Sequence, residues 1–70
     1  MKFNEYVTQQ MKVTGQTSRR AIINQIAKRA GVSFHLLSNV DRGYRISNYN
    51  KASAVAAATD FAVTVKDLCE

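Results

Sequence analysis

The polar residues best suited to specific recognition lie in one short segment, Ser33 to Arg42. Asn39 carries an amide that can form two hydrogen bonds with adenine, and His35 can donate a hydrogen bond to guanine or to a phosphate. Ser38 offers a hydroxyl that can donate or accept. These groups fit the recognition of base edges in the major groove of DNA, provided that one helix carries them. The residues expected to contact bases are Ser33, Phe34, His35, Ser38, Asn39 and Arg42.

Two apolar residues within this segment, Phe34 and Leu36, each fit more than one role. An exposed Phe34 could pack against thymine methyl groups, whereas a helix that starts slightly rotated would bury the same ring in the core. Both interpretations of Phe34 stay open. For Leu36 we favour partial burial, against a neighbouring element or against a partner.

The residues around the polar segment predict a helix-turn-helix unit between Gln25 and Gly43. A first helix would end at Gly31, because a helix C-terminus favours a residue in the left-handed conformation. Ser33 can cap a second helix that runs from Phe34 to about Arg42. Two short helices joined by a glycine turn form such a unit. The signal for this unit is the size and polarity of the residues at six spaced positions, which are Ile26, Ala27, Gly31, Val32, Leu37 and Val40.

Apolar residues at three- and four-residue spacing predict further helices around this unit. The expected elements are a helix over 3–12, a loop over 13–17, a helix from 17 or 18 to 30, a helix from 48 to 59 or 60, and a short final helix. Thr64 with Asp67 fits the capping-box pattern at the start of that last helix. The expected fold class is therefore all-α, with five helices in a single domain over residues 1–70.

Basic residues are concentrated in the middle of the chain. The net charge is +5, but residues 12–51 contain eight basic residues and one acidic residue, which gives this part a charge of +7. The distribution favours a polyanionic partner on one face, although a solvated basic surface is the simpler explanation. The residues expected to contact phosphates are Arg19, Arg20, Lys28, Arg29, Tyr44, Arg45, Asn48, Tyr49, Asn50 and Lys51.

Two parts of that set have alternative explanations. Arg19 and Arg20 oppose the helix dipole in the first turn of their helix, which indicates either a small loss of stability or placement for phosphates. Residues 44–51 combine tyrosine, asparagine and cations, a composition that suits phosphate contacts and also an ordinary turn.

The composition argues against an enzyme. The one histidine, His35, has no Cys, Asp or Glu at metal-ligand spacing, so neither a metal site nor a cofactor is expected. Cys69 is a single thiol without an obvious base, and a free thiol suits a reducing cytosol. The first ten residues lack the apolar run of a signal peptide or a membrane span, so we expect a cytoplasmic location and no membrane partner.

The segment GVSFHLLSNVDRG resembles the turn and recognition helix of the lambda-repressor-like family, which includes phage Cro proteins, phage repressors and bacterial regulators of the xenobiotic-response-element type. Members often end that helix with an acid-Arg-Gly sequence, which is Asp41-Arg42-Gly43 here. Tyr44-Arg45-Ile46-Ser47 looks like the family's next loop, and VAAATDFAVTVKDL looks like its last two helices. The resemblance covers about residues 22–68.

The chain departs from the family pattern at three places. Phe61-Ala62 replaces the small residue or glycine that is usual in the turn between the last two helices. Ile23 stands where members often have a glutamine that touches phosphate, so that contact is not carried over. The helix before the turn also starts early, at about Ser18.

The resemblance implies a sequence-specific DNA-binding transcriptional regulator, of the Cro-like repressor kind found in phages and prophages. Such a protein would bind double-stranded DNA at a palindromic operator as a homodimer, in the cytoplasm of a bacterial or phage-infected cell. The chain leaves no room for an effector domain, so no small-molecule effector is expected. Two alternatives are a protein-interaction module on the same fold, such as an antitoxin or a bridging factor, and an architectural or excision-type DNA-binding protein.

The residues that would form a dimer surface are expected near the last helix. The alternative is that the same side chains all serve the core of one chain. The candidates are Phe61, Val63, Val65 and Leu68.

Overall fold

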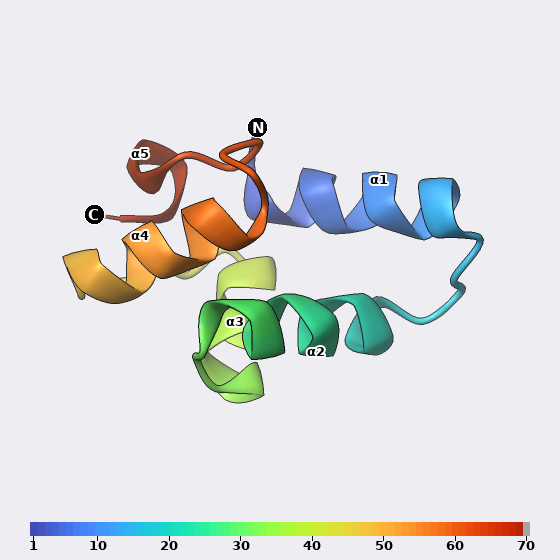
Figure 1. Ribbon diagram of the computed structural model, residues 1–70, viewed down its shortest axis with the longest axis horizontal. Coiled ribbons are helices and arrows are strands. Elements are labelled where there is room, and N and C mark those ends of the chain that lie inside the picture. Colours follow the sequence, from blue (N-terminus) through green and yellow to red (C-terminus); the bar gives the residue numbers. More distant parts are fainter. Residues whose placement is uncertain (70) are drawn as a thin grey trace.

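The computed structural model describes residues 1–69, which fold into five helices (Figure 1). They are α1 (Phe3–Thr14), α2 (Arg19–Ala30), α3 (Phe34–Asp41), α4 (Tyr49–Ala58) and α5 (Val65–Leu68). Within residues 1–69 there is no β-strand, and one isolated parallel bridge joins Ile46 to Cys69. The all-α prediction is confirmed, and the early start of α2 is confirmed with it. None of these helices has the length and apolar character needed to cross a membrane.

Side-chain caps start α2, α3, α4 and α5 where the sequence indicates. Each cap accepts a hydrogen bond from the backbone N–H three residues further on, which satisfies a donor that the helix itself leaves unpaired. The capping residues are Ser18, Ser33, Asn48 and Thr64. α1 begins differently, because the Glu5 carboxylate accepts the backbone N–H of Lys2 at 3.3 Å. α1 also ends at Thr14, two residues later than the predicted 12.

α2 and α4 end with different residues in the left-handed conformation. After α2, Gly31 takes this conformation with a φ of 71°, as the glycine turn requires. After α4, Asp60 and Phe61 take it instead, with φ angles of 54° and 63°. The Phe61 N–H donates to the Ala56 carbonyl at 2.8 Å, which closes α4 as a Schellman motif does. The turn after α4 therefore places the side chains of Asp60 and Phe61 in a conformation that favours glycine.

One hydrophobic core lies between the inner faces of all five helices. Figure 1 shows α1 and α2 running antiparallel, with α4 and α5 gathered at the end where α1 begins. Thr59 is a buried polar residue, and its hydroxyl donates to the Ala56 carbonyl at 2.9 Å and accepts the Val63 N–H at 3.2 Å. The core residues are Phe3, Val7, Ile22, Ile23, Ile26, Ala27, Leu37, Val40, Ile46, Ala52, Val55, Ala56, Val63 and Leu68.

Asp67 links α5 to the start of the chain. Its carboxylate accepts hydrogen bonds from the Thr64 N–H at 3.2 Å, from the Thr64 hydroxyl at 2.9 Å and from the Met1 ammonium at 3.2 Å. The bond from the Thr64 backbone, followed by that from its hydroxyl, lowers the pKa of Asp67 below its ordinary value. Because the pKa is lowered in the folded state, this stabilisation is present at neutral pH and is lost as the pH falls through that lowered pKa.

Candidate nucleic-acid interface

One face of α3 is polar and turned away from the core. Leu37 and Val40 are 0% and 7% exposed, so they fix which side of α3 faces inward. The opposite side carries side chains at helical spacing, of which His35 and Arg42 are exposed and the other two are half-buried. We call this set the reading face, and it consists of His35, Ser38, Asn39 and Arg42. The structure thus brings together four of the six residues expected to contact bases.

Ser33, the fifth of those six residues, caps α3. Its side chain is at the start of the helix and exposed. The Ser33 hydroxyl oxygen accepts the Leu36 N–H at 3.1 Å. The hydroxyl still has a proton to donate to a phosphate or a base.

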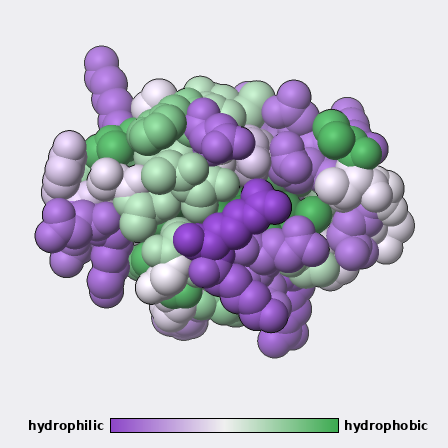
Figure 2. All heavy atoms as spheres, in the orientation of Figure 1, coloured by the Kyte–Doolittle hydropathy of each residue, from purple (hydrophilic) through white to green (hydrophobic). Residues whose placement is uncertain are grey.

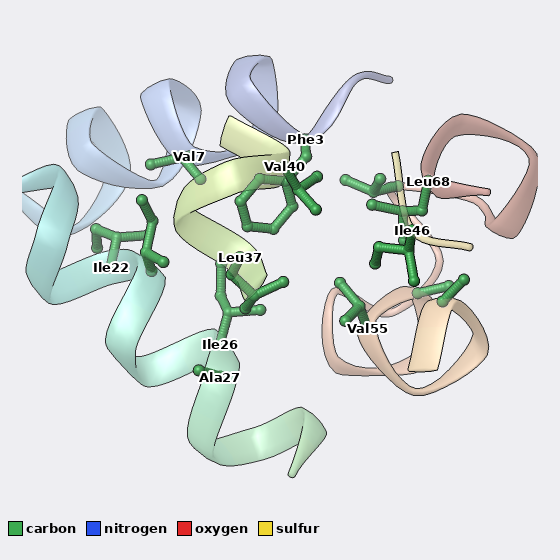
Figure 3. Close-up of a cluster of buried hydrophobic side chains, with 14 residues drawn as sticks. Phe3, Val7, Ile22, Ile26, Ala27, Leu37, Val40, Ile46, Val55 and Leu68 are labelled. Atoms are coloured by element: carbon green, nitrogen blue, oxygen red, sulfur yellow. The ribbon is translucent and has the colours of Figure 1, made fainter. Parts of the chain in front are cut away.

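Both α1 and α2 support the inner side of α3. Figure 3 shows Leu37 beside Ile26 of α2, and Val40 beside Phe3 of α1. Ala27 of α2 is 3% exposed, and its small side chain permits α2 and α3 to approach closely. The reading face is therefore held by packing along the whole length of α3.

Arg19 joins three helices through its guanidinium. It forms an ion pair with Asp41 at the end of α3, with Nε 3.3 Å from Oδ2. It also donates to the Thr8 hydroxyl at 2.7 Å and to the Asn4 carbonyl at 3.2 Å, both in α1. The sequence predicted that Arg19 contacts phosphate, but these partners occupy its guanidinium, so no phosphate contact is expected of it. These contacts give Arg19 a structural role, although its positive charge in the first turn of α2 opposes the helix dipole.

Replacing Arg19 by methionine is expected to lower the free energy of unfolding by about 1–2 kcal/mol. The variant keeps most of the aliphatic stem, but it loses charged hydrogen bonds at a partly exposed site, where solvent reduces their contribution. Urea denaturation measures the effect, and Arg29→Met is the matched control because Arg29 is exposed on the same helix. A loss no larger than that of the control would show that the Arg19 contacts do not hold α1, α2 and α3 together.

Phe34 and Leu36 are both half-buried and pack against the core. The guanidinium carbon of Arg20 lies 5.3 Å from the centroid of the Phe34 ring, within the range of a cation–π interaction. Leu36 matches the partial burial that we favoured. Phe34 lies between the two interpretations, because its ring is half-buried against the core, and contact with thymine methyl groups stays untested.

The other residues expected to contact phosphates are exposed on two segments. One segment is α2, and the other is the connection from α3 into the start of α4. The exposed residues are Arg20, Lys28, Arg29, Tyr44, Arg45, Asn48, Tyr49, Asn50 and Lys51. Figure 2 shows hydrophilic side chains over α2, beside a paler and mildly apolar area over the alanine-rich α4.

Two of these residues also have structural roles. The Asn48 side chain caps α4 by accepting the Lys51 N–H at 3.2 Å. Arg45 donates to the Cys69 carbonyl at 3.3 Å, which fastens the connection after α3 to the C-terminal segment. These two contacts fit the interpretation of an ordinary turn, and phosphate binding by residues 44–51 stays a prediction.

The expected dimer surface needs correction. Val63 and Leu68 are 0% exposed because they complete the core of the single chain under α4, and Val65 is half-buried against that core. Of the four candidates, Phe61 is left at the surface, with 63% of its area exposed. The alternative interpretation, in which these side chains serve the core, is thus confirmed for Val63 and Leu68.

Sequence reasoning missed Asn24. It is exposed on α2, four residues after Arg20, and both residues line one hollow together with Phe34. The four-residue spacing was the signal that could have found it, because it puts Asn24 and Arg20 on the same face of a helix. In the described part of the chain, no three His, Cys, Asp or Glu side chains gather as metal ligands would.

Comparison with known proteins found no matching family model, no matching curated protein and no matching solved structure. The interface is therefore interpreted from its own geometry. That geometry consists of a polar face on α3, supported from behind by two helices and flanked by exposed basic residues.

Proposed function

We propose that this chain is a sequence-specific DNA-binding transcriptional regulator that places α3 in the major groove. The observation that carries the proposal is the reading face, a polar row on a helix whose opposite side is fixed in the core. α3 has eight residues and is about 12 Å long, which is similar to the width of the major groove. Asn39 and His35 supply hydrogen bonds to base edges, while Arg42 suits a guanine or a phosphate.

The exposed basic residues supply the second part of this function. Cations on α2 and around the start of α4 would lie over the phosphates on either side of the groove, where they fix the position of α3 without reading sequence. Lys51 is suited to this role because it is exposed in the first turn of α4. The net charge of +5 favours association with DNA.

The short reading face favours a repressor that acts as a pair. A single α3 covers only a few base pairs, so two copies at half-sites about one helical turn apart would supply the required specificity. The arrangement of α2 and α3 is consistent with a lambda-repressor-like fold, and the small size with a Cro-like phage or prophage repressor. Phe61 is the exposed candidate for contact between the two copies.

The salt dependence of binding to duplex DNA tests the electrostatic part of this proposal. The logarithm of the binding constant is expected to fall linearly with the logarithm of the salt concentration, as counterions are released. Lys51→Gln is expected to weaken binding to all sequences and to reduce the slope by about 0.9. Fluorescence anisotropy with a pool of mixed-sequence duplexes measures both quantities.

Lys12→Gln is the matched control for the lost charge. Lys12 is exposed near the end of α1, which Figure 1 places at the opposite end of the molecule from the start of α4. The control is expected to keep the wild-type slope. An unchanged slope for Lys51→Gln would remove Lys51 from the interface. Absence of duplex binding even at low salt would contradict the function and favour the protein-interaction module.

A further inference from the structure

A hollow lies beside the place where α3 begins. It has a volume of about 530 Å³ and is formed by the first turns of α2 together with the first residue of α3. The residues that line it are Ser18, Arg20, Ala21, Asn24 and Phe34. Its lining therefore joins the helix that we assign to base reading with the helix that carries exposed cations.

The Phe34 ring limits where the Arg20 guanidinium can lie. The guanidinium carbon is 5.3 Å from the ring centroid, although Arg20 itself is exposed. Phe34 is half-buried against the core, so the ring is a fixed surface and not a second mobile side chain. A guanidinium has five N–H donors, so attraction to the ring leaves donors available for an anion.

Asn24 places an amide at the same hollow. It follows Arg20 by four residues, so both side chains leave the same face of α2. An amide N–H and the edge of a guanidinium are both donors, and together they suit an anionic oxygen. A phosphate oxygen of the DNA backbone is the anion that would come near this hollow if α3 enters the groove.

We propose that the hollow binds one backbone phosphate of the DNA through Arg20 and Asn24, and that Phe34 is the residue that positions Arg20 for this contact. The inference rests on the proposed function. It gives Phe34 a positioning role in place of a direct contact with thymine methyl groups.

A double-mutant cycle on the full chain tests the inference. Binding of one duplex is measured over a range of salt concentrations for wild type, Arg20→Gln, Phe34→Leu and the double variant. Arg20→Gln is expected to reduce the salt slope by about 0.9. Phe34→Leu is expected to weaken binding about two- to fivefold when Arg20 is present, and to have no further effect when Arg20 is absent. Phe34→Tyr keeps an aromatic ring and is expected to retain wild-type affinity.

A variant of Asn24 and a check of folding complete the experiment. Asn24→Ala is expected to weaken binding of every duplex to a similar extent, because a phosphate contact carries no base preference. Thermal unfolding by circular dichroism confirms that each variant is folded. If Phe34→Leu is not folded, Phe34→Met replaces it in the cycle, because methionine is also apolar and lacks the aromatic ring.

The outcomes distinguish a failure of the proposed phosphate contact from a failure of DNA binding as a whole. Losses of binding free energy from Arg20→Gln and Phe34→Leu that simply add would overturn the positioning role of Phe34. In that case wild type would still bind DNA, so the proposed function would stand. Failure of wild type to bind any duplex would overturn both.

Discussion

Replacing Leu37 by alanine is expected to lower the free energy of unfolding by about 3–4 kcal/mol. The side chain is 0% exposed and packs beside Ile26 at the crossing of α2 and α3, so its loss removes apolar contacts and leaves a cavity. A chain of 70 residues has a total stability of roughly 4–10 kcal/mol, so much of it would be lost. The expected fall in melting temperature is about 15–25 °C, measured by circular dichroism.

Leu36→Ala provides the matched control for this prediction. Leu36 is the preceding residue and has the same side chain, but it is half-buried at the edge of the core. We expect the control to lose about 1–2 kcal/mol, because less apolar area is removed from contact. Equal losses in the two variants would mean that α3 is not oriented with Leu37 inward, and the reading face would then be wrongly assigned.

Replacing Asn39 by alanine is expected to reduce the discrimination between the preferred duplex and a scrambled one. A bidentate pair between an amide and adenine contributes about 1–3 kcal/mol of discrimination, which corresponds to a factor of roughly 5 to 150. The affinity for the scrambled duplex should stay nearly unchanged, because phosphate contacts carry the nonspecific part of binding. Competition binding with both duplexes in the same buffer measures this ratio.

Asn50→Ala is the control for Asn39→Ala. Asn50 is exposed near the start of α4, where the account assigns contact with the backbone and not with bases. Its loss should affect both duplexes by the same factor and leave the ratio intact. If Asn50→Ala changed the ratio while Asn39→Ala did not, base readout would belong to the segment after α3.

The local parts of this structure could be predicted from the sequence. Ser33 caps α3 and Gly31 ends α2 because capping and a left-handed turn depend on residues only a few positions apart. The same holds for the inward side of α3, where Leu37 and Val40 have the spacing of a helical face. The reading face follows from these two residues, since it is the side that they leave outward.

Contacts between distant residues could not be predicted in the same way. Arg19 and Asp41 are 22 positions apart, and their pairing depends on how α2 and α3 cross. The contact of Arg20 with Phe34 likewise requires two helix starts to lie together in space. Sequence alone therefore assigned both arginines to phosphates, although the structure gives them different surroundings.

The burial of Val63 and Leu68 shows a related limit. Apolar residues near the end of a chain have the same pattern whether they cover the core or face a partner. Whether they cover the core or face a partner depends on whether the other helices leave part of the core unfilled. Here Val63 and Leu68 fill the core beside α4 and α5. Phe61 stays outside because it lies in the left-handed turn after α4.

Selection of bound sequences from a random pool of DNA duplexes tests whether α3 recognises a specific sequence. The full chain is incubated with the pool at moderate salt, and bound duplexes are recovered and sequenced over successive rounds. We expect an enriched palindromic motif with two half-sites centred about one helical turn apart. A pool that stays random after selection, with binding that depends on salt alone, would contradict sequence-specific recognition by α3.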